Sequence, residues 1–493
     1  MSDHDAIVIG AGYGGVTVAS LLAREGRRVL LVDKNEQAGG KAMTVRRRGY
    51  AYELWPVHGL PARDSRLHEL VRTLGVGDDS LFLMPDGPKV GERFYKRPDG
   101  TWQHDPPIDD TTGGTPTIER TQQQLDVSDE EMAKFVEMAT AIATMPEEEI
   151  DALDDVGMLE WMRGFDLAEP IITQQATMLN LVFVAPVDRI PVSEGVRTLR
   201  QLFLGGGPRY AAGGFGRVAE LAARYVDDHG GRFLTGTRVE TILVEGGRAV
   251  GIRTKDGEER RAPVVISNAG IHPTALEARP RGALPADYVE RVRGLEPGWG
   301  MVGLRYFFSR PVFEARTASM YSDQSWLDTD RYARLMASEW EPDVPLAYIT
   351  IPSNWDPSMA PPGHQVVQVG ILGSPDPTSE VNERLVDRAE ATIEELWPGV
   401  LEHLERKERY TARQVSNLTR DSAVPGQGGE CIGLGQVIGQ CGGSKPDART
   451  PLPGLYLVGC DAGGFGCGTH QAVESGFAVA AMVRAELEAR QPA

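Results

Sequence analysis

The first 33 residues combine apolar runs with a glycine-rich turn in a pattern that is typical of a β-α-β unit. Residues 6–9 read Ala-Ile-Val-Ile, a short apolar run that predicts a buried strand. A glycine-rich turn follows, and then an apolar helical pattern over 16–24, which Gly26 ends. Residues 28–32 predict a second buried strand that closes at Asp33. We expect the two strands to lie parallel in one sheet, joined by a right-handed crossover.

The same patterning predicts more elements further along. Strands are expected over 239–244, 249–253, 262–267 and 455–458, and helices over 218–229 and 471–490. Residues 85–125 are rich in Pro, Gly, Asp and Thr and predict loops or hairpins. Residues 126–155 carry 11 acidic side chains and one Lys, which is typical of a solvated helical face with a loop. Residues 170–204 are unusually apolar and predict a buried helix or the wall of an apolar pocket.

The net charge of the chain limits the kinds of partner that the protein is expected to bind. The 493 residues include 51 Lys and Arg against 70 Asp and Glu, a formal net charge of −19. Because nucleic-acid phosphates require clustered cations, we expect no nucleic-acid partner. No basic leader precedes the first apolar run, and no stretch reaches the ~18 apolar residues of a membrane span. We therefore expect a cytoplasmic protein, with peripheral contact to a membrane at most.

The glycine-rich turn after the first strand is the first motif in the chain that indicates a ligand. Gly10, Gly12 and Gly15 match G-x-G-x-x-G between a strand and a helix, with Gly14 inside the motif, and Asp33 follows 18 residues after Gly15. Gly10 permits the tight turn, Gly12 lets the backbone approach a pyrophosphate, and Gly15 lets the helix pack on the strand. The helix N-terminus attracts phosphate, and Asp33 would accept ribose hydroxyls. The pattern predicts a dinucleotide site.

A second glycine pair narrows the choice of dinucleotide. Asp33 and Lys34 lead into the turn Gly39-Gly40-Lys41, for which a plain NAD domain has no need. This extension resembles the FAD-binding flavoproteins of the glutathione-reductase type, in the branch with amine oxidases and phytoene desaturases. The resemblance implies that the second turn lies along the pyrophosphate and flavin. The run Arg46-Arg47-Arg48 would either add phosphate contacts or form a basic surface strand.

The C-terminal region resembles the same family. Residues 450–461 predict a loop, a strand and an acidic end, similar to the C-terminal FAD motif of phytoene-desaturase-like proteins. The resemblance implies that Gly459 and Asp461 meet the ribityl chain and pyrophosphate, and that Val239 contacts adenine through its backbone. The glycine-rich run that ends at Thr469 opens a helix whose positive end would favour a reduced, anionic flavin.

The resemblance thus implies an α/β fold with two parts. One is a discontinuous Rossmann-type FAD-binding domain over 1–80, 206–284 and 431–493. The other is an inserted α+β substrate-binding domain over 81–205 and 285–430, where no motif identifies a substrate. The cofactor-binding residues that the motifs and the resemblance predict are Gly10, Gly12, Gly14, Gly15, Asp33, Lys34, Gly39, Gly40, Lys41, Val239, Gly459, Asp461 and Thr469.

Catalytic candidates come from the cysteines and histidines. All four cysteines lie in the last 63 residues, without the close pairs of zinc or iron–sulfur sites, and we expect no metal centre. They are either buried structural residues or, for Cys460 and Cys467, thiols beside the flavin that donate a proton or form a redox pair. His470 begins the last helix and would be either a proton donor or acceptor or a simple cap. His58 lies in a segment that, in relatives, runs past the flavin.

We therefore expect an FAD-dependent dehydrogenase or desaturase that introduces a C=C bond into a largely apolar, cyclic or polyene substrate. Flavin N5 would take a hydride and His470 the proton. Oxygen, a quinone or another carrier would be the electron acceptor. Alternatives on the same scaffold are a redox-neutral isomerase or a saturase. A flavin-free binding protein resembling the Rab GDP-dissociation inhibitors is a further alternative, against which the intact glycine and aspartate motifs argue.

Overall fold

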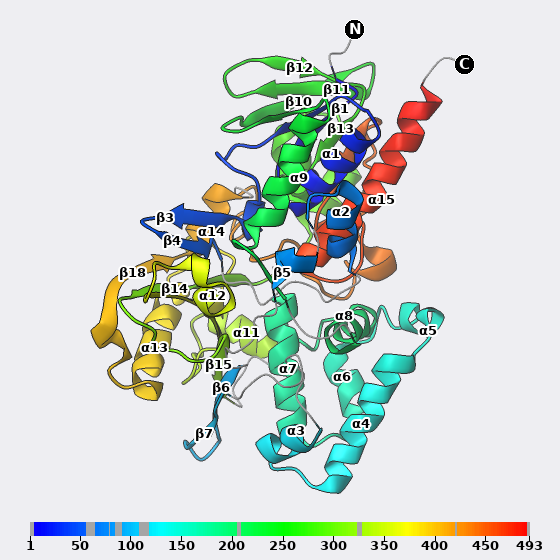
Figure 1. The fold of residues 1–493 in the computed structure, drawn as a ribbon. Coiled ribbons are helices and arrows are strands. Elements are labelled where there is room, and N and C mark those ends of the chain that lie inside the picture. Colours follow the sequence, from blue (N-terminus) through cyan, green and yellow to red (C-terminus); the bar gives the residue numbers. More distant parts are fainter. Residues whose placement is uncertain are drawn as a thin grey trace.

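The computed structural model describes residues 4–55, 65–77, 79–83, 91–107, 118–204, 209–322, 328–419 and 422–490. Its elements form three groups, which are separate in Figure 1. A parallel sheet with its helices lies at the top and an antiparallel sheet at the lower left. A cluster of helices, from α3 (Ile118–Leu125) to α8 (Val192–Leu204), lies at the lower right.

The first group is built on a parallel sheet in the order β19-β13-β1-β2-β9. Its strands are β1 (Ala6–Ile9), β2 (Val29–Val32), β9 (Arg232–Leu234), β13 (Val265–Ser267) and β19 (Leu455–Leu457). Helix α1 (Tyr13–Arg24) connects β1 to β2 and packs against α9 (Gly216–Asp228) and α15 (Gly468–Ala489). Strands from three separate stretches of chain thus share one sheet. The expected Rossmann-type fold is confirmed.

Helix α1 begins at Tyr13, three residues before the predicted start. Its first turns contain glycines that allow close packing. A Cβ atom on Gly15 would lie 1.9 Å from the carbonyl oxygen of Gly10, so only glycine fits there. On the neighbouring helix α15, a Cβ atom on Gly476 would lie 2.5 Å from Cβ of Thr17. Glycine has a low helix propensity, but here it permits the backbone contact that buries α1.

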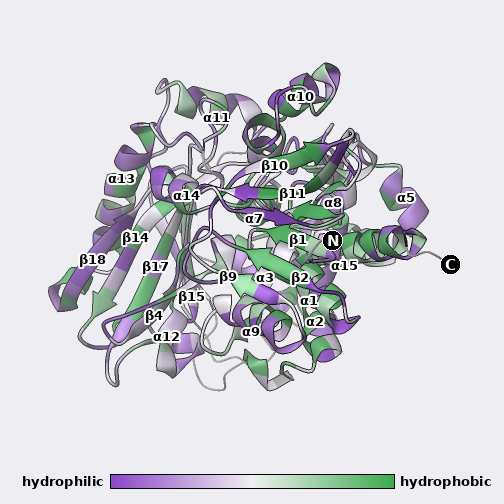
Figure 2. Cartoon of the chain, turned by 90° about the horizontal axis from the view of Figure 1, so that it is seen from above, coloured by the Kyte–Doolittle hydropathy of each residue, from purple (hydrophilic) through white to green (hydrophobic). Residues whose placement is uncertain are grey.

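The second group is a sheet in the order β18-β14-β17-β16-β15-β6-β7. Its strands are β6 (Glu92–Lys96), β7 (Trp102–Asp105), β14 (Gly300–Phe308), β15 (Thr317–Ser322), β16 (Ala347–Thr350), β17 (Gln365–Gly373) and β18 (Leu404–Tyr410). The hairpin β6–β7 falls in the segment expected to hold loops or hairpins, and β6 pairs parallel to β15. The edge strand β18 is mostly hydrophilic, whereas β1 and β2 of the parallel sheet are hydrophobic (Figure 2).

The third group contains the acidic and apolar segments noted in the sequence. It comprises α3, α4 (Asp129–Thr144), α5 (Glu147–Asp151), α6 (Met158–Arg163), α7 (Glu169–Phe183) and α8. Helix α4 begins with a capping box between Ser128 and Glu131 and buries only Met132, Met138 and Ile142. Its acidic face is therefore solvated, as expected. Helix α7 is the predicted buried helix.

The short strands β5 (Phe82–Leu83) and β8 (Tyr210–Ala211) form an antiparallel pair outside these groups. Further strands and longer helices lie outside the two sheets and the helical cluster. They are β3 (Thr44–Arg47), β4 (Tyr50–Glu53), α2 (Arg66–Leu74), β10 (Val239–Glu245), β11 (Arg248–Thr254), β12 (Glu259–Arg261), α10 (Ala286–Arg293), α11 (Thr329–Met336), α13 (Val381–Leu396) and α14 (Ala412–Leu418). Within the described ranges, no helix is both long enough and apolar enough to cross a bilayer.

Candidate functional site

The turn between β1 and α1 presents backbone donors at one edge of the parallel sheet. Gly10 adopts φ = +93°, which glycine reaches without strain, and the first N–H groups of α1 have no partners within the helix. Asp33, at the end of β2, accepts hydrogen bonds from the N–H groups of Ala11 at 2.7 Å and Asn35 at 2.8 Å. Burial raises the pKa of Asp33, and the two donors oppose that effect. The carboxylate is thereby fixed beside the glycine turn.

A second glycine turn, from the other end of the chain, lies against the first. A Cβ atom on Gly14 would lie 2.9 Å from both Cα and the backbone nitrogen of Gly459. One on Gly12 would lie 2.7 Å from Nδ2 of Asn268. Gly459 follows β19 with φ = +111°, and its N–H donates to Ser475 Oγ at 3.1 Å. Glycine at these positions lets the two turns lie in direct backbone contact, and together they form a backbone cradle.

One cavity of about 1070 Å³ runs from this cradle into the other two groups of elements. At the cradle its walls include all the predicted cofactor residues except Gly15, which lies behind the turn. At the other end its walls come from α3, α4, α7 and α8 and from strands β6, β14, β15 and β16, with Arg93 of β6 among the lining residues. Pockets for one drug-sized ligand measure roughly 300–1,000 Å³, so this volume is suited to a cofactor together with a substrate.

The charged groups of three predicted cofactor-binding residues form hydrogen bonds to backbone groups of loops around the cavity. Lys41 Nζ donates to the carbonyl oxygens of Glu430 at 2.5 Å and Ile432 at 2.9 Å. Lys34 Nζ donates to the Asn417 carbonyl at 3.0 Å. The two carboxylate oxygens of Asp461 accept from the N–H groups of Ile271 at 2.9 Å and Leu434 at 3.0 Å. All three residues line the cavity, and their contact with a cofactor stays a prediction.

The basic run on β3 lies apart from this cavity. Arg46 pairs with Glu220 at 2.7 Å and donates to the Gly213 carbonyl at 2.9 Å. None of the residues 46–48 lines the cavity; they border a small separate hollow instead. Of the two alternatives for this run, the structure therefore favours a basic surface strand over phosphate contacts.

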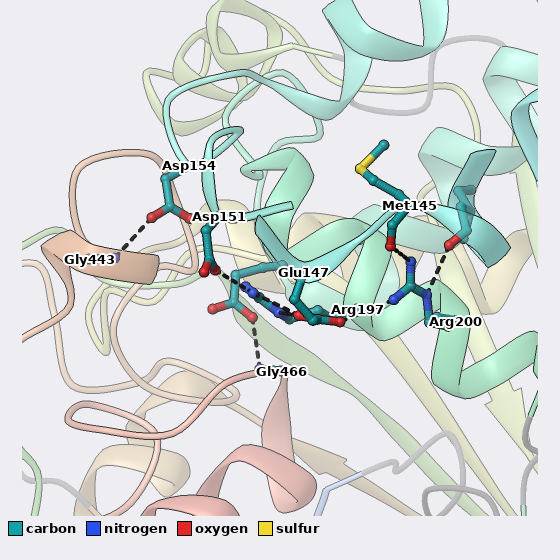
Figure 3. Close-up of polar contacts among 10 residues, drawn as sticks. Met145, Glu147, Asp151, Asp154, Arg197, Arg200, Gly443 and Gly466 are labelled. Carbon is teal, nitrogen blue, oxygen red and sulfur yellow. Dashed lines mark hydrogen bonds and ion pairs between the residues drawn. The ribbon is translucent and has the colours of Figure 1, made fainter. Parts of the chain in front are cut away.

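The loop before α15 is docked on the cluster of helices. The buried carboxylate of Glu194 on α8 accepts a hydrogen bond from the Gly466 N–H at 2.7 Å. One turn along α8, the Arg197 guanidinium lies 4.7 Å from the centre of the Phe465 ring. Arg197 also pairs with Glu147 and Asp151, and Asp154 accepts from the Gly443 N–H at 2.9 Å (Figure 3). These contacts join the helical cluster to the C-terminal segment.

The cysteines are all free thiols, and three of them line the cavity. Cys467 Sγ donates to the Val182 carbonyl on α7 at 2.9 Å, and Cys460 Sγ donates to the Gly468 carbonyl at 3.2 Å. Burial raises the pKa of Cys467 well above its ordinary value and that of Cys431 to about 11. A thiolate is the reactive form, so the geometry favours a structural thiol at Cys467 over a redox partner.

His470 faces the cavity from the first turn of α15. Its Nε2 lies 2.8 Å from Nε2 of Gln201 on α8, and its Nδ1 is buried with no partner among the described residues. Burial lowers the pKa of His470, Glu474 raises it, and Arg66 lowers it further. The imidazole is therefore neutral near pH 7, and Nδ1 is its ring nitrogen without a partner among the described residues. The other predicted histidine, His58, lies outside the described residues.

Sequence reasoning missed the polar residues on α8. Glu194, Thr198 and Gln201 are spaced by four and three positions, which places them on one helical face. This polar stripe within an apolar segment could have indicated that these residues lie at a functional site. Its contacts to Gly466 and His470 join two stretches of chain more than 250 residues apart, and no local pattern in the sequence encodes such a pairing.

The geometry fits a dinucleotide that extends into a larger ligand site. The glycine positions let the two turns pack closely on each other and on Asn268, the N-terminus of α1 suits a pyrophosphate, and Asp33 lies beside that turn, where it could accept from a ribose. Among the described residues, no group of His, Cys, Asp and Glu side chains could hold a metal ion.

Known proteins are similar to this chain over most of its length. A family model described as flavin containing amine oxidoreductase matches residues 13–484. Human all-trans-retinol 13,14-reductase is 23% identical, covering 95% of this chain and 84% of its own. The phytoene desaturase (neurosporene-forming) of Rhodobacter capsulatus is 26% identical, covering 97% and 93%. The chloroplastic prolycopene isomerase of Daucus carota is 24% identical, covering 99% and 81%.

A solved structure agrees with the fold. An oxidoreductase from Methanosarcina mazei superposes with a TM-score of 0.70 at 18% identity, covering 96% of this chain and 99% of the other. The family match begins at Tyr13, just after Gly10 and Gly12, and runs through Gly459 to residue 484 within α15. The expected cofactor, FAD, is confirmed. This chain belongs to the flavin-containing amine oxidoreductase family and is an FAD-dependent oxidoreductase.

Proposed function

We propose that this enzyme removes two hydrogens from adjacent carbons of a largely apolar molecule and so introduces a C=C bond. The observation that carries the proposal is the single cavity that joins the FAD cradle to the helical cluster. Where described residues of α3, α4, α7 and α8 line it, none of their side chains is charged. A protonated amine would find no carboxylate on these walls, and burying it there would be costly. An apolar carbon skeleton suits them.

The names of the relatives support an apolar substrate. They refer to retinol, phytoene and prolycopene, and all three proteins align over most of this chain. We further propose that residues 81–205 and 285–430 form the substrate-binding part, because they supply the cavity walls remote from the cradle. Oxygen, a quinone or another carrier would be the electron acceptor, and an apolar substrate could be collected by peripheral contact with a membrane.

FAD, when bound, supplies a hydride acceptor at N5 of its ring system. The chain must then take up the accompanying proton, and His470 is our candidate for that step. Its neutral imidazole faces the cavity, and Gln201 can face Nε2 with either its NH₂ or its oxygen. When the oxygen accepts the Nε2 hydrogen, Nδ1 is left as the proton acceptor. The apolar walls would exclude water, so the proton would pass from the substrate to His470 and not to solvent.

An isomerase or a saturase remains the second candidate on this scaffold. The prolycopene isomerase and the retinol reductase are as similar to this chain as the desaturase, so identity alone does not separate the three reactions. The difference lies in the flavin state that each reaction needs. A dehydrogenase starts from oxidised flavin, whereas a saturase needs reduced flavin.

The test is anaerobic mixing of the purified, FAD-loaded enzyme with apolar alkenes and polyenes. Bleaching of the flavin absorption together with a product two hydrogens lighter supports the dehydrogenase. Turnover that begins only after chemical reduction of the flavin, with a product of equal mass or two hydrogens heavier, would replace it with the isomerase or the saturase.

A further inference from the structure

A polar row crosses the second sheet where that sheet forms the wall of the cavity. The strand register pairs Tyr348 of β16 with Ser319 of β15, and Ser319 with Arg93 of β6. Directly paired residues on neighbouring strands point to the same face of a sheet, about 5 Å apart. All three residues line the cavity, and all three are partly exposed. They therefore present a guanidinium and hydroxyls side by side.

Arg93 is the charged member of this row. Among the described side chains that the helical cluster and the second sheet contribute to the cavity, it is the only charged one. The Arg93 side chain is 15% exposed, and its Nε donates to Asp105 Oδ2 on β7 at 2.6 Å. Burial raises the pKa of Tyr321 to about 12, while the charge of Arg93 and a hydrogen bond from it act in the opposite direction. Tyr321 also lines the cavity, so its hydroxyl lies at the same guanidinium.

Asp105 does not cancel the positive charge at this place. Burial lowers the pKa of Arg120 on α3, Asp105 raises it, and Arg93 lowers it further, so the three groups lie within electrostatic range of one another. Two guanidinium groups thus act on one carboxylate, and these three side chains carry one net positive charge. The other oxygen of Asp105 accepts from Gln103 Nε2 at 3.3 Å, and Asp105 itself does not line the cavity. The group that faces a ligand is therefore the cation.

A ligand that fills the cavity must replace the water around the Arg93 guanidinium. Removing a charged group from water is costly unless a counter-charge and hydrogen-bond partners take the place of the water. A hydrocarbon supplies neither, and an alcohol supplies only a neutral acceptor. A carboxylate supplies the charge and two coplanar acceptors that match the guanidinium, and it can also accept from the hydroxyls of Ser319 and Tyr321. A dianion would bring a second negative charge close to Asp105, so a monoanion fits better.

We propose that the substrate of this enzyme is a long apolar molecule with a terminal carboxylate, which Arg93, Ser319 and Tyr321 bind at the second sheet. This inference rests on the proposed function, since it specifies the substrate class for the same cavity. The carbon chain lies along the uncharged walls of α7 and α8 toward the glycine cradle. Arg93 and the two hydroxyls then select an acid over the corresponding alcohol or ester.

The experiment measures binding of matched probes to the oxidised holoenzyme by titration calorimetry. One set is oleate, oleyl alcohol and methyl oleate, and a shorter set is laurate, lauryl alcohol and methyl laurate. We expect the acid of at least one set to bind about 10-fold more tightly than its alcohol and its ester, because hydrogen bonds to a charged group are the stronger ones and a site built for them disfavours an analogue that cannot form them.

Two variants of the ion pair should change the affinity for the acid in opposite directions. Arg93→Met should weaken binding of the acid by about 10- to 100-fold and leave the alcohol nearly unchanged. Asp105→Asn can still accept from Arg93 but lacks the competing negative charge, so it should bind the acid more tightly than the unmodified protein does. A merely structural ion pair would weaken both ligands alike in both variants. Arg97→Met is the matched control, since Arg97 is exposed, donates to Gln103 at 3.1 Å and does not line the cavity.

Equal affinity for the acid and its neutral analogues, or binding of no member of either set, would overturn this inference. So would a preference for the acid that Arg93→Met retains. If Arg93→Met does not fold, Asp105→Asn decides, and an affinity for the acid that stays unchanged or falls in that variant overturns the inference.

The proposed function fails separately. If the alcohol or the ester binds and bleaches the flavin as well as the acid does, the dehydrogenase role stands and the carboxylate preference falls. If the acids bind preferentially but no probe, including the apolar alkenes and polyenes, bleaches the flavin, the preference stands and the dehydrogenase role falls.

Discussion

The carboxylate of Glu194 on α8 accepts a hydrogen bond from the backbone N–H of Gly466, at a distance of 2.7 Å. This contact joins the helical wall of the cavity to the loop that begins α15, the helix whose first turn carries His470. The other oxygen of Glu194 has no partner among the described residues. Burial raises the pKa of Glu194, while Lys445 and the Gly466 N–H oppose that effect. The junction between the helical cluster and the C-terminal loop thus contains a titratable group.

The raised pKa of Glu194 predicts a pH-dependent stability. Between its ordinary pKa of 4.5 and its raised folded value, the folded protein binds more protons than the unfolded chain. The stabilisation is therefore full below the ordinary pKa and is lost as the pH rises through the folded pKa. Glu194→Gln should lack this loss. We expect the melting temperature of the unmodified protein to fall relative to that of the variant as the pH rises above about 5.

Thermal unfolding of both proteins at a series of pH values checks this prediction. Glu149→Gln is a suitable control, because Glu149 is an exposed acidic residue on the nearby helix α5. If the melting temperatures of the unmodified protein and Glu194→Gln changed in parallel with pH, the carboxyl of Glu194 would have its ordinary pKa. That result would contradict the prediction.

Asp33 provides a direct test of the cofactor cradle. Asp33→Ala removes the carboxylate that would accept the ribose hydroxyls, and hydrogen bonds to a charged group contribute about 1.5–3 kcal/mol. We expect FAD to bind roughly 10- to 100-fold more weakly, as measured by flavin absorption retained after gel filtration and by titration of the apoprotein. Asp33→Asn, which can still accept from the Ala11 N–H, separates a folding defect from lost ribose contact.

Arg46→Ala is the matched control for the cradle. It removes a charged side chain from the adjacent strand β3, yet Arg46 pairs with Glu220 and lies outside the cavity. FAD binding should therefore be unchanged in this variant. Full retention of FAD by Asp33→Ala, or its loss from Arg46→Ala, would mean that the cofactor does not lie against the predicted turn.

The glycine cradle could be predicted from the sequence further than the helical end of the cavity. The β1–α1 turn is a local pattern, in which glycine spacing and Asp33 follow from backbone geometry within one β-α-β unit. The apolar run over 170–204 correctly indicated buried helices. Which of its polar residues face the cavity depends on how α8 packs against a loop near residue 466. That contact is set by tertiary packing, so the pairing of Gln201 with His470 was not predictable.

The buried thiol of Cys467 should be slow to react. Burial keeps its pKa well above the ordinary value, and Cys431 has a pKa of about 11, so both are protonated at about pH 8. Alkylation requires the thiolate. We expect iodoacetamide to leave both cysteines unmodified in the folded holoenzyme and to modify all four cysteines in urea, as read by mass spectrometry of peptides. Rapid modification of Cys467 in the folded protein would restore the redox-partner hypothesis.

The lowered pKa of His470 predicts the pH dependence of turnover. As the pH falls through the folded pKa, which lies below 6.5, the imidazole is protonated and can no longer accept the substrate proton. The rate should therefore be level near pH 7 and decline only on the acid side. His470→Asn should lower kcat by about 10²- to 10⁴-fold, which is the usual contribution of a general base, and should abolish the acid limb. The measurement is the anaerobic rate of flavin reduction against pH.

Variants of two neighbours of His470 should shift the acid limb of the pH–rate profile in opposite directions. Such shifts would distinguish a catalytic base from a structural histidine. Glu474 raises the pKa of His470 and Arg66 lowers it, and the two residues pair with each other at 2.7 Å. Glu474→Gln should therefore shift the limb to lower pH, and Arg66→Met should shift it to higher pH, with the rate near pH 7 largely retained. Because a cap or packing residue would give no such paired shifts, limbs that stay in place in both variants would assign the proton to another group.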